Sequence, residues 1–350
     1  MNILIPIYYL SVYANNANPY VRSLAEGLKR YGHHVVCSMD DFWQDDISYD
    51  IVYFQWPDVL LPFVNEFGLG KLEEQITKHK KNGSKIVTTC HNMHPHDNNP
   101  NKMAIYNQIY SLTDAFHHMG EGSYLQMHQK YSRARHFIAP HHIADSLFQN
   151  NLSSEEARRM LHIPSQDVVI ASFGEFRNRE EERLFLSMAE DVGDNAITYL
   201  APRMPRGRLY NGRNISRSIK CLHRNIQLHR LNIKIKGTKL SQEEQQCWLT
   251  ASDIVFIQRK DILNSGNIPL AFSQGKIAVG PNLGNVGGIL RDTENFWFDP
   301  TDRRTVRNAV LRAINAHREG KLGSRNLEYA KANWTTDKIC GLINREMLSL

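Results

Sequence analysis

The feature that most constrains the fold of this chain is an alternation of short apolar runs with longer segments of helical periodicity. Strand-like runs are predicted at residues 1–7, 33–38, 50–56, 85–90, 115–119 and 135–140, and helices at 19–32, 65–82, 101–112 and 121–132. In the helix expected at 19–32, apolar residues recur at helical spacing, and Gly32 stands where a C-terminal cap is expected. Such βαβ alternation predicts an α/β fold, in which helices cover both faces of a parallel sheet.

The second half of the chain repeats this pattern. Strand-like runs return at residues 167–173, 196–201, 233–236, 253–258, 276–280 and 296–299. A chain of 350 residues, 41% of them hydrophobic, is too long for one core and can bury two. We therefore predict a Rossmann-like domain at 1–160, a second at 161–325, and a helical C-terminal segment at 326–350, with packing on the first domain as one option for that segment. The two parallel sheets are expected to face each other across a cleft.

Composition excludes several classes of protein. No run of about 18 uncharged apolar residues occurs, and Met1 leads directly into a strand-like run without a signal-peptide pattern. The expected location is therefore cytoplasmic, with peripheral attachment to the inner face of the cell membrane as an extension. The five cysteines form no C-x-x-C pair, which argues against a disulfide framework, a zinc ribbon or a thioredoxin-like redox site.

Positive charge is concentrated in one stretch of the second half. Between Asp194 and Glu243 there is no acidic residue, whereas eleven cations occur there: Arg203, Arg206, Arg208, Arg213, Arg217, Lys220, Arg224, Arg230, Lys234, Lys236 and Lys239. Such a stretch favours a nucleoside diphosphate or an anionic membrane surface as partner. Nucleic acid is not expected, because neither zinc-finger spacing nor an RNP-type aromatic pattern accompanies the charge. A solvated basic surface without a ligand is the alternative.

The loops that follow the predicted strands are unusually polar. In open α/β sheets, ligands bind beyond the carboxyl ends of the strands. The loops there include Y-A-N-N-A-N-P at 13–19, G-E-F-R-N-R at 174–179 and R-K-D-I-L-N-S-G at 259–266. The first strand is not followed by the G-x-G-x-x-G turn of a nicotinamide-dinucleotide site, so hydride transfer is not expected.

Three histidines follow the strand-like run at 85–90. His91, His94 and His96 suggest a metal site, but a dinuclear hydrolase of the H-x-H-x-D-H type would need an aspartate and a histidine at positions that hold Asn98 and Asn99. A zinc ion on two loop histidines with a distant third ligand is a weak signal compared with H-E-x-x-H on a helix. A satisfied histidine cluster and a metal-free sugar site are the other two interpretations.

The motifs taken in order resemble a known family. Segment 18–36 is similar to the first helix and glycine–histidine turn of GT-B glycosyltransferases, and segment 88–96 is similar to their strand end with an active-site histidine. Segment 135–142 resembles the last strand of their first domain, and segment 171–179 resembles the first strand and glycine turn of their second domain. Segment 251–280 is similar to their donor-binding strand, loop and helix. The resemblance is to the large retaining group of bacterial polysaccharide synthesis, and it spans nearly the whole chain.

This resemblance implies a donor site in the second domain. Gly174 would let the backbone approach a bulky anion, and Arg177 would neutralise a donor diphosphate. Glu180 stands where the family has a lysine, so the second cation is expected to be Arg179 or Arg203. The expected phosphate cradle consists of Asn264, Ser265 and Gly266, which precede a predicted helix. Ile262 and Leu270 stand where the family has two glutamates, so the usual carboxylate for the donor ribose is missing. Asp261, one position before Ile262, is the expected substitute.

The same resemblance implies an acceptor site in the first domain. His91 is expected to contact the sugar and the reacting centre, and Asp97 competes with it if a general base is required. The residues expected to bind the acceptor are Asn15, Asn16, His94 and His96. The predicted activity is transfer of a sugar from a nucleoside diphosphate sugar, preferably a UDP-sugar, to a glycan or lipid-linked acceptor, without metal or cofactor. A metal-dependent hydrolase and a non-catalytic nucleotide-sugar-binding protein are the alternatives.

Overall fold

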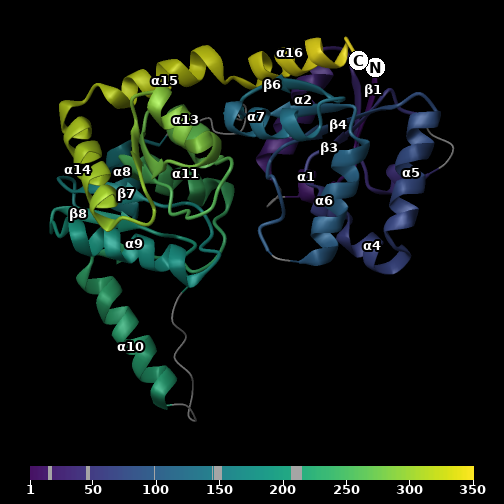
Figure 1. Ribbon diagram of the computed structural model, residues 1–350. Helices are drawn as coiled ribbons and strands as arrows, with labels where there is room; N and C mark the ends of the chain where they lie inside the picture. The colour runs from purple at the N-terminus through teal and green to yellow at the C-terminus, as the bar shows by residue number, and fades with distance from the viewer. Residues whose placement is uncertain (15–17, 45–47, 98, 144, 146–151, 206–214) are drawn as a thin grey trace. The chain divides into compact units, whose positions relative to one another are not determined.

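The computed structural model describes the chain except for residues 15–17, 45–47, 98, 144, 146–151 and 206–214. Its contacts divide it into two compact units (Figure 1). The first unit comprises Met1–Leu147 together with Asn333–Leu350, and the second comprises Phe148–Ala332. The first unit is therefore built from two separate stretches of chain.

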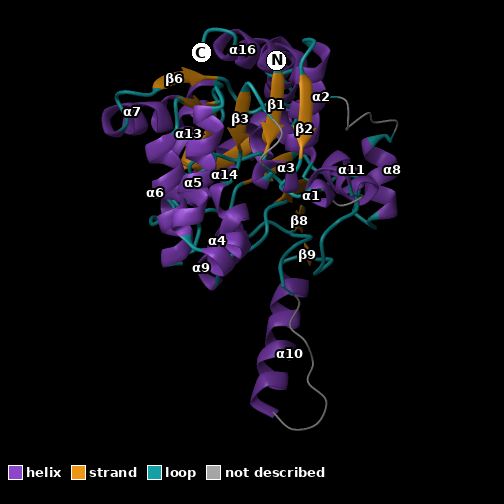
Figure 2. Ribbon diagram, turned by 90° about the vertical axis from the view of Figure 1, so that its right-hand side faces the viewer, coloured by secondary structure: helices purple, strands orange, loops and turns teal. Residues whose placement is uncertain are grey.

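The first unit contains a parallel sheet of six strands in the order β2-β1-β3-β4-β5-β6 (Figure 2). The strands are β1 (Asn2–Ile5), β2 (His34–Cys37), β3 (Ile51–Phe54), β4 (Lys85–Thr89), β5 (Ala115–His118) and β6 (Arg135–Ile138). The helical segments are α1 (Tyr9–Tyr13), α2 (Pro19–Arg30), α3 (Asp40–Trp43), a 3₁₀ turn η1 (Pro57–Leu60), α4 (Leu61–Phe67), α5 (Leu69–Lys81), α6 (Pro100–Leu112), α7 (Glu121–Lys130) and α16 (Thr336–Met347). Every residue of β3 is buried, as continuous apolar strands of a helix-covered parallel sheet should be.

Local sequence explains where α2 begins and ends. The side chain of Asn18 accepts a hydrogen bond from the Tyr20 backbone N–H, and Pro19 occupies the first helical position, where no N–H is needed. After the helix, Gly32 has a φ of +81°, a left-handed conformation that a residue without Cβ adopts at little cost. This agrees with the cap expected at Gly32 from the sequence.

The second unit contains another parallel sheet of six strands, in the order β12-β11-β10-β7-β8-β9. Its strands are β7 (Val168–Ala171), β8 (Ile197–Leu200), β9 (Ile233–Lys234), β10 (Ile254–Phe256), β11 (Ile277–Pro281) and β12 (Phe296–Phe298). Its helices are α8 (Ser154–Met160), α9 (Arg179–Val192), α10 (Ile215–Arg230), α11 (Gln242–Ala251), α12 (Asn267–Ser273), α13 (Gly284–Asp292), α14 (Arg303–Glu319) and α15 (Leu322–Asn333). The predicted α/β architecture with two parallel sheets is confirmed.

The boundary between the units lies in other places than the sequence suggested. The expected first domain ended at residue 160, after α8, but α8 packs against α11 of the second unit. At the other end, α15 stays with the second unit, and α16 lies on α2 of the first (Figure 1). Within the described residues, no helix combines the length and the apolar character that crossing a bilayer requires.

Close packing holds α16 on the first unit. A Cβ added to Gly27 would clash with the Cys340 sulfur, so the two helices approach closely only because residue 27 has no side chain. Upstream of α16, the Ile143 N–H donates to the Trp334 carbonyl at 2.9 Å. The Thr336 hydroxyl donates to the Asp145 carboxylate at 2.5 Å. The C-terminal segment is thus part of the first unit's folded structure.

Candidate functional site

The carboxyl end of the sheet in the first unit carries His91. β4 ends at Thr89, and His91 follows two residues later, beside the segment Gln55–Trp56 that follows β3. The imidazole is 8% exposed. It stacks on the Trp56 ring at 4.2 Å between centroids and meets the edge of Tyr20 at 5.0 Å. Two aromatic rings therefore hold the orientation of His91 before any ligand binds.

A hydrogen bond determines which nitrogen of His91 carries the proton. Nε2 donates to Oε1 of the Gln55 side chain at 3.1 Å, so the lone pair of the neutral ring lies on Nδ1. Burial lowers the pKa of His91 well below its ordinary value, and the nearby His141, His117 and His142 lower it further. The ring is therefore neutral at physiological pH. The neutral ring can make polar contacts with a sugar. It is a weak general base, whereas the general base of an inverting transfer works best with a pKa near neutral.

Burial distinguishes His91 from the two other histidines of the cluster, because His91 is buried. His94 and His96 are exposed, and His94 Nδ1 donates to the neighbouring Pro95 carbonyl at 3.2 Å. Asp97 is also exposed and forms an ion pair with Lys102 at 2.7 Å. Across the parts of the chain that the structure describes, no three histidine, cysteine, aspartate or glutamate side chains gather as a metal site would require. Asn15 and Asn16, the other residues expected to bind the acceptor, lie outside the described residues.

In the second unit, a tight contact joins the carboxyl ends of β7 and β10. The Ser172 hydroxyl donates to the Gln258 side-chain oxygen at 2.5 Å, and the Gln258 amide donates to the Gly174 carbonyl at 2.9 Å. A Cβ on Gly174 would lie 2.8 Å from Gln258 Nε2 and 2.9 Å from Arg259 Nη2. Gly174 is therefore required so that Gln258 and Arg259 can approach the loop after β7.

Arg259, which the sequence analysis did not single out, is the buried cation of this site. It is 8% exposed, forms an ion pair with Glu181 and donates to the Glu175 carbonyl at 2.6 Å. Glu181 also accepts from the Arg177 backbone N–H at 2.8 Å, which ties the loop after β7 to the same carboxylate. Burial, together with the charge of Arg177, lowers the pKa of Arg259 to about 10. Two guanidinium groups are thus close enough to repel each other, which is favourable where an anion binds between them.

The other predicted cations have different surroundings. Arg177 is exposed on one side, yet the protein around it partly desolvates the guanidinium and lowers its pKa, against the opposing charges of Glu181, Asp261 and Glu175. Arg203 forms an ion pair with Glu175 at 2.5 Å, and Arg179 is an exposed residue at the start of α9. Arg259 is thus a buried cation beside Arg177, and the charge of Arg203 also lowers its pKa.

The loop at 260–266 packs against the beginning of α13. Gly284 has a φ of +51°, and a Cβ there would lie 2.6 Å from the Ile262 carbonyl oxygen. The Asn285 amide donates to the Asn264 side-chain oxygen at 2.7 Å. Ile262 and Leu270 are each 8% exposed, so both positions serve the apolar interior. This packing accounts physically for the absence of carboxylates at these two positions.

The predicted phosphate cradle is a short helix start. The Asn267 N–H donates to the Ser265 hydroxyl at 3.3 Å, and Gly266, as N-cap, provides no side-chain hydrogen bond. α12 has only seven residues, so its dipole is small. Asp261 is exposed beside Arg177. The terminus of this short helix therefore supplies little positive potential of its own.

Comparisons with solved structures identify the architecture. Sucrose-phosphate synthase from Thermosynechococcus elongatus matches with a TM-score of 0.71 at 12% identity, covering 100% of this chain and 99% of the other. HepE from Anabaena, in complex with UDP and glucose, matches with a TM-score of 0.70 at 14% identity, covering 100% of both chains. The chain has the GT-B fold.

The catalytic domain of starch synthase IV from Arabidopsis thaliana, bound to ADP and acarbose, shares this fold with a TM-score of 0.64 at 11% identity, covering 99% of each chain. No protein-family model and no curated protein matches the sequence. The expected GT-B resemblance is confirmed at the level of the fold. Identities this low do not transfer individual residues from one GT-B protein to another.

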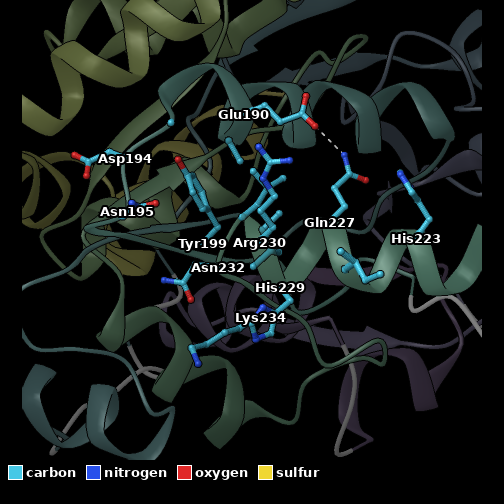
Figure 3. Close-up of a pocket in the computed structure, with 15 residues that line it drawn as sticks. Glu190, Asp194, Asn195, Tyr199, His223, Gln227, His229, Arg230, Asn232 and Lys234 are labelled. Carbon is cyan, nitrogen blue, oxygen red and sulfur yellow. Dashed lines mark hydrogen bonds between the residues drawn. The ribbon is translucent and has the colours of Figure 1, made fainter.

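A hollow in the second unit lies away from the predicted site residues. It measures about 930 Å³ and is bounded by the end of α9, by β8 and β9, and by α10 (Figure 3). Its polar lining includes Glu190, whose carboxylate accepts from the Gln227 amide at 2.8 Å. None of the predicted site residues lines it. Size alone therefore does not identify the donor site.

The buried histidines of the first unit predict a loss of stability in acid. Burial lowers the pKa of His117 and of His141 to about 4 and that of His118 to about 3. Below about pH 6.5 the unfolded chain binds protons on these rings, whereas the folded chain does not until the pH approaches 4. The free energy of unfolding should therefore fall as the pH falls through this window, by up to about 1.4 kcal/mol per pH unit for each ring.

Urea unfolding at a series of pH values between 7 and 4 measures this effect. His141→Gln removes one titrating ring and should reduce the slope of stability against pH. A stability that stays constant through the window, or a slope unchanged in the variant, would contradict the assignment of these rings as buried and neutral.

Proposed function

We propose that this chain is a glycosyltransferase that moves a sugar from a nucleoside diphosphate sugar to a glycan or lipid-linked acceptor. The observation that carries the proposal is the buried Arg259, placed with Arg177 at the carboxyl ends of β7 and β10 of a GT-B fold. The fold neighbours support it, since they include HepE in complex with UDP and with UDP-glucose, and starch synthase IV bound to ADP. A UDP-sugar is the preferred donor.

The donor end of the proposed reaction rests on charge. Breaking the bond between the sugar and the diphosphate leaves negative charge on the leaving group, and fixed cations stabilise that charge without rearranging. Arg259 is held by Glu181 and the Glu175 carbonyl, while Arg177 has an exposed side from which it can reach a phosphate. Two guanidinium groups supply the charge that a divalent cation supplies in other transferases, so we propose transfer without a bound metal.

The acceptor end rests on His91. We propose that the neutral imidazole, oriented by Trp56 and Gln55, contacts the transferred sugar at the reacting centre. Because its pKa is lowered by burial, it is a poor general base at neutral pH, which favours retention of configuration over inversion. His94 and His96, together with Asn15 and Asn16, are proposed to bind the acceptor. Asp97 is the weaker catalytic candidate, because Lys102 pairs with it.

The proposed setting is surface polysaccharide synthesis at the inner face of the cell membrane. The basic stretch at 203–239 supports this setting through its charge. A metal-dependent hydrolase is not favoured, since no three histidine, cysteine, aspartate or glutamate side chains of the described residues gather as metal ligands.

A thermal-shift screen with UDP, GDP, ADP, TDP and CMP, with and without EDTA, tests the proposal. A diphosphate present at about 100 times its dissociation constant should add about 2.7 kcal/mol to the stability, and chelation should not change this. Release of nucleoside diphosphate from the matching sugar nucleotide then measures transfer. Binding without turnover on any acceptor would indicate a sugar-nucleotide-binding protein. Turnover that EDTA abolishes and zinc restores would indicate a metalloenzyme.

A further inference from the structure

Helix α10 has one face tied to the second unit. Cys221 and Leu228 on that face are 6% and 5% exposed. Arg224 forms an ion pair with Glu182 of α9 at 2.6 Å, and the Gln227 amide donates to Glu190 of the same helix at 2.8 Å. The rest of the helix extends away from the body of the unit (Figures 1 and 2). The described contacts thus fix which side of α10 is turned outward.

Helix α10 carries an apolar stripe made of Ile219, Leu222 and Ile226, the last of which also lines the rim of the hollow shown in Figure 3. These three side chains are 61%, 56% and 58% exposed. Their spacing of three and four residues places them in one row along the helix, about 100–180° around the axis from Cys221 and Leu228. A row of more than half-exposed aliphatic side chains on a projecting helix suggests an apolar partner.

The sequence around the stripe is basic. Helix α10 contains Arg217, Lys220, Arg224 and Arg230 and no acidic residue, and Lys234 follows in β9. Along α9, Glu182 pairs with Arg224, whereas Glu190 accepts a hydrogen bond from the neutral Gln227 amide and keeps its charge. Two cations of the basic stretch do not contribute to this surface: Arg203 pairs with Glu175 and Lys236 with Glu244. Positive charge beside the stripe therefore comes mainly from α10 and the turn after it.

We propose that α10 attaches this protein to membranes that contain anionic phospholipids, with the apolar stripe inserted at the boundary between headgroups and acyl chains. Apolar residues on one face of a helix with cations beside them are the chemistry of interfacial amphipathic helices. A second copy of the chain fits less well, since it would bring like charges together around a row of only three apolar residues. The proposal names the element behind the membrane setting of the proposed function, and it is tested without any transfer reaction.

Liposome flotation tests the attachment. The full chain is mixed with vesicles of phosphatidylcholine alone or with about one third phosphatidylglycerol, at low and at high salt. Binding is expected only to the anionic vesicles, and salt should weaken it because counterions screen the cations. Combining Ile219→Ser, Leu222→Ser and Ile226→Ser should reduce the partition coefficient about tenfold or more. Arg230→Gln with Lys234→Gln should reduce binding at low salt more than at high salt.

A matched control changes three equally exposed apolar side chains elsewhere. Leu125, Met160 and Leu348 are 67%, 62% and 64% exposed, and their replacement by serine should leave flotation unchanged. Circular dichroism and nucleotide binding show whether each variant is folded. Nucleotide binding then reports loss of the donor site, and flotation reports loss of membrane attachment. Flotation of the stripe variant at the wild-type level, or absence of binding to anionic vesicles, overturns the proposal. A dimer that the stripe variant converts to monomers in sedimentation, without vesicle binding, also overturns it.

Discussion

Arg259→Ala is expected to abolish measurable donor binding and to destabilise the second unit. The substitution leaves the Glu181 carboxylate, whose side chain is 3% exposed, without its charged partner. Removing one member of a buried ion pair typically destabilises a protein by about 3–5 kcal/mol, because the remaining charge is buried and uncompensated. Urea unfolding measures the stability, and isothermal titration with the nucleotide found in the thermal-shift screen measures binding.

The double variant Arg259→Met with Glu181→Gln separates the two effects. It removes both charges, and glutamine retains an oxygen that can accept from the Arg177 N–H. Stability should largely recover, whereas donor binding should not. Arg177→Ala, at an exposed position, should keep the fold and lose about 2–4 kcal/mol of transition-state stabilisation. Donor affinity at the wild-type level in the double variant would show that Arg259 is only a structural partner of Glu181.

His91→Ala is expected to lower turnover by roughly 10²–10⁴-fold while nucleotide binding in the second unit remains. The reason is that Trp56, Tyr20 and Gln55 fix a polar group where the resemblance places the transferred sugar. Steady-state kinetics on the matching donor and acceptor, with the nucleotide dissociation constant from titration, separates chemistry from binding.

Two further variants make this test specific. His94→Ala and His96→Ala change exposed loop histidines and should affect acceptor affinity more than the rate of the chemical step. His91→Gln fills more of the buried space than alanine and guards against simple loss of folding. Full activity in both His91 variants would leave only a packing role for this residue.

The fold was predictable from the sequence because local patterns and global architecture agree. The strand-like runs at 50–56 and 85–90 contain β3 and β4, and the helix expected at 19–32 contains α2. The run at 233–236 was longer than β9, which pairs only through Ile233 and Lys234 at the edge of the sheet. An edge strand has a partner on one side only, so its length depends on tertiary contacts that periodicity does not encode.

The candidate site was less predictable, because its charges are decided by distant partners. Arg259 directly follows the strand-like run at 253–258, which was a usable signal, but its importance comes from Glu181, 78 residues away. The basic stretch at 203–239 looked uniformly unpaired because it contains no acid of its own. Arg203, Arg224 and Lys236 nevertheless pair with glutamates outside it. Sequence shows which residues can carry charge, and only the fold shows which charges are neutralised.

The position of α16 on α2 affects how the chain can fold during synthesis. Residues 1–147 leave the ribosome long before residues 333–350, so the first unit must wait for the whole second unit before Cys340 can cover Gly27. In the meantime, the nascent first unit exposes the apolar groove of α2 that α16 will fill. Emergence of residues 333–350, rather than of the first half of the chain, is therefore the event that completes the first unit, and the stretch 1–147 expressed alone would expose apolar surface to which chaperones bind.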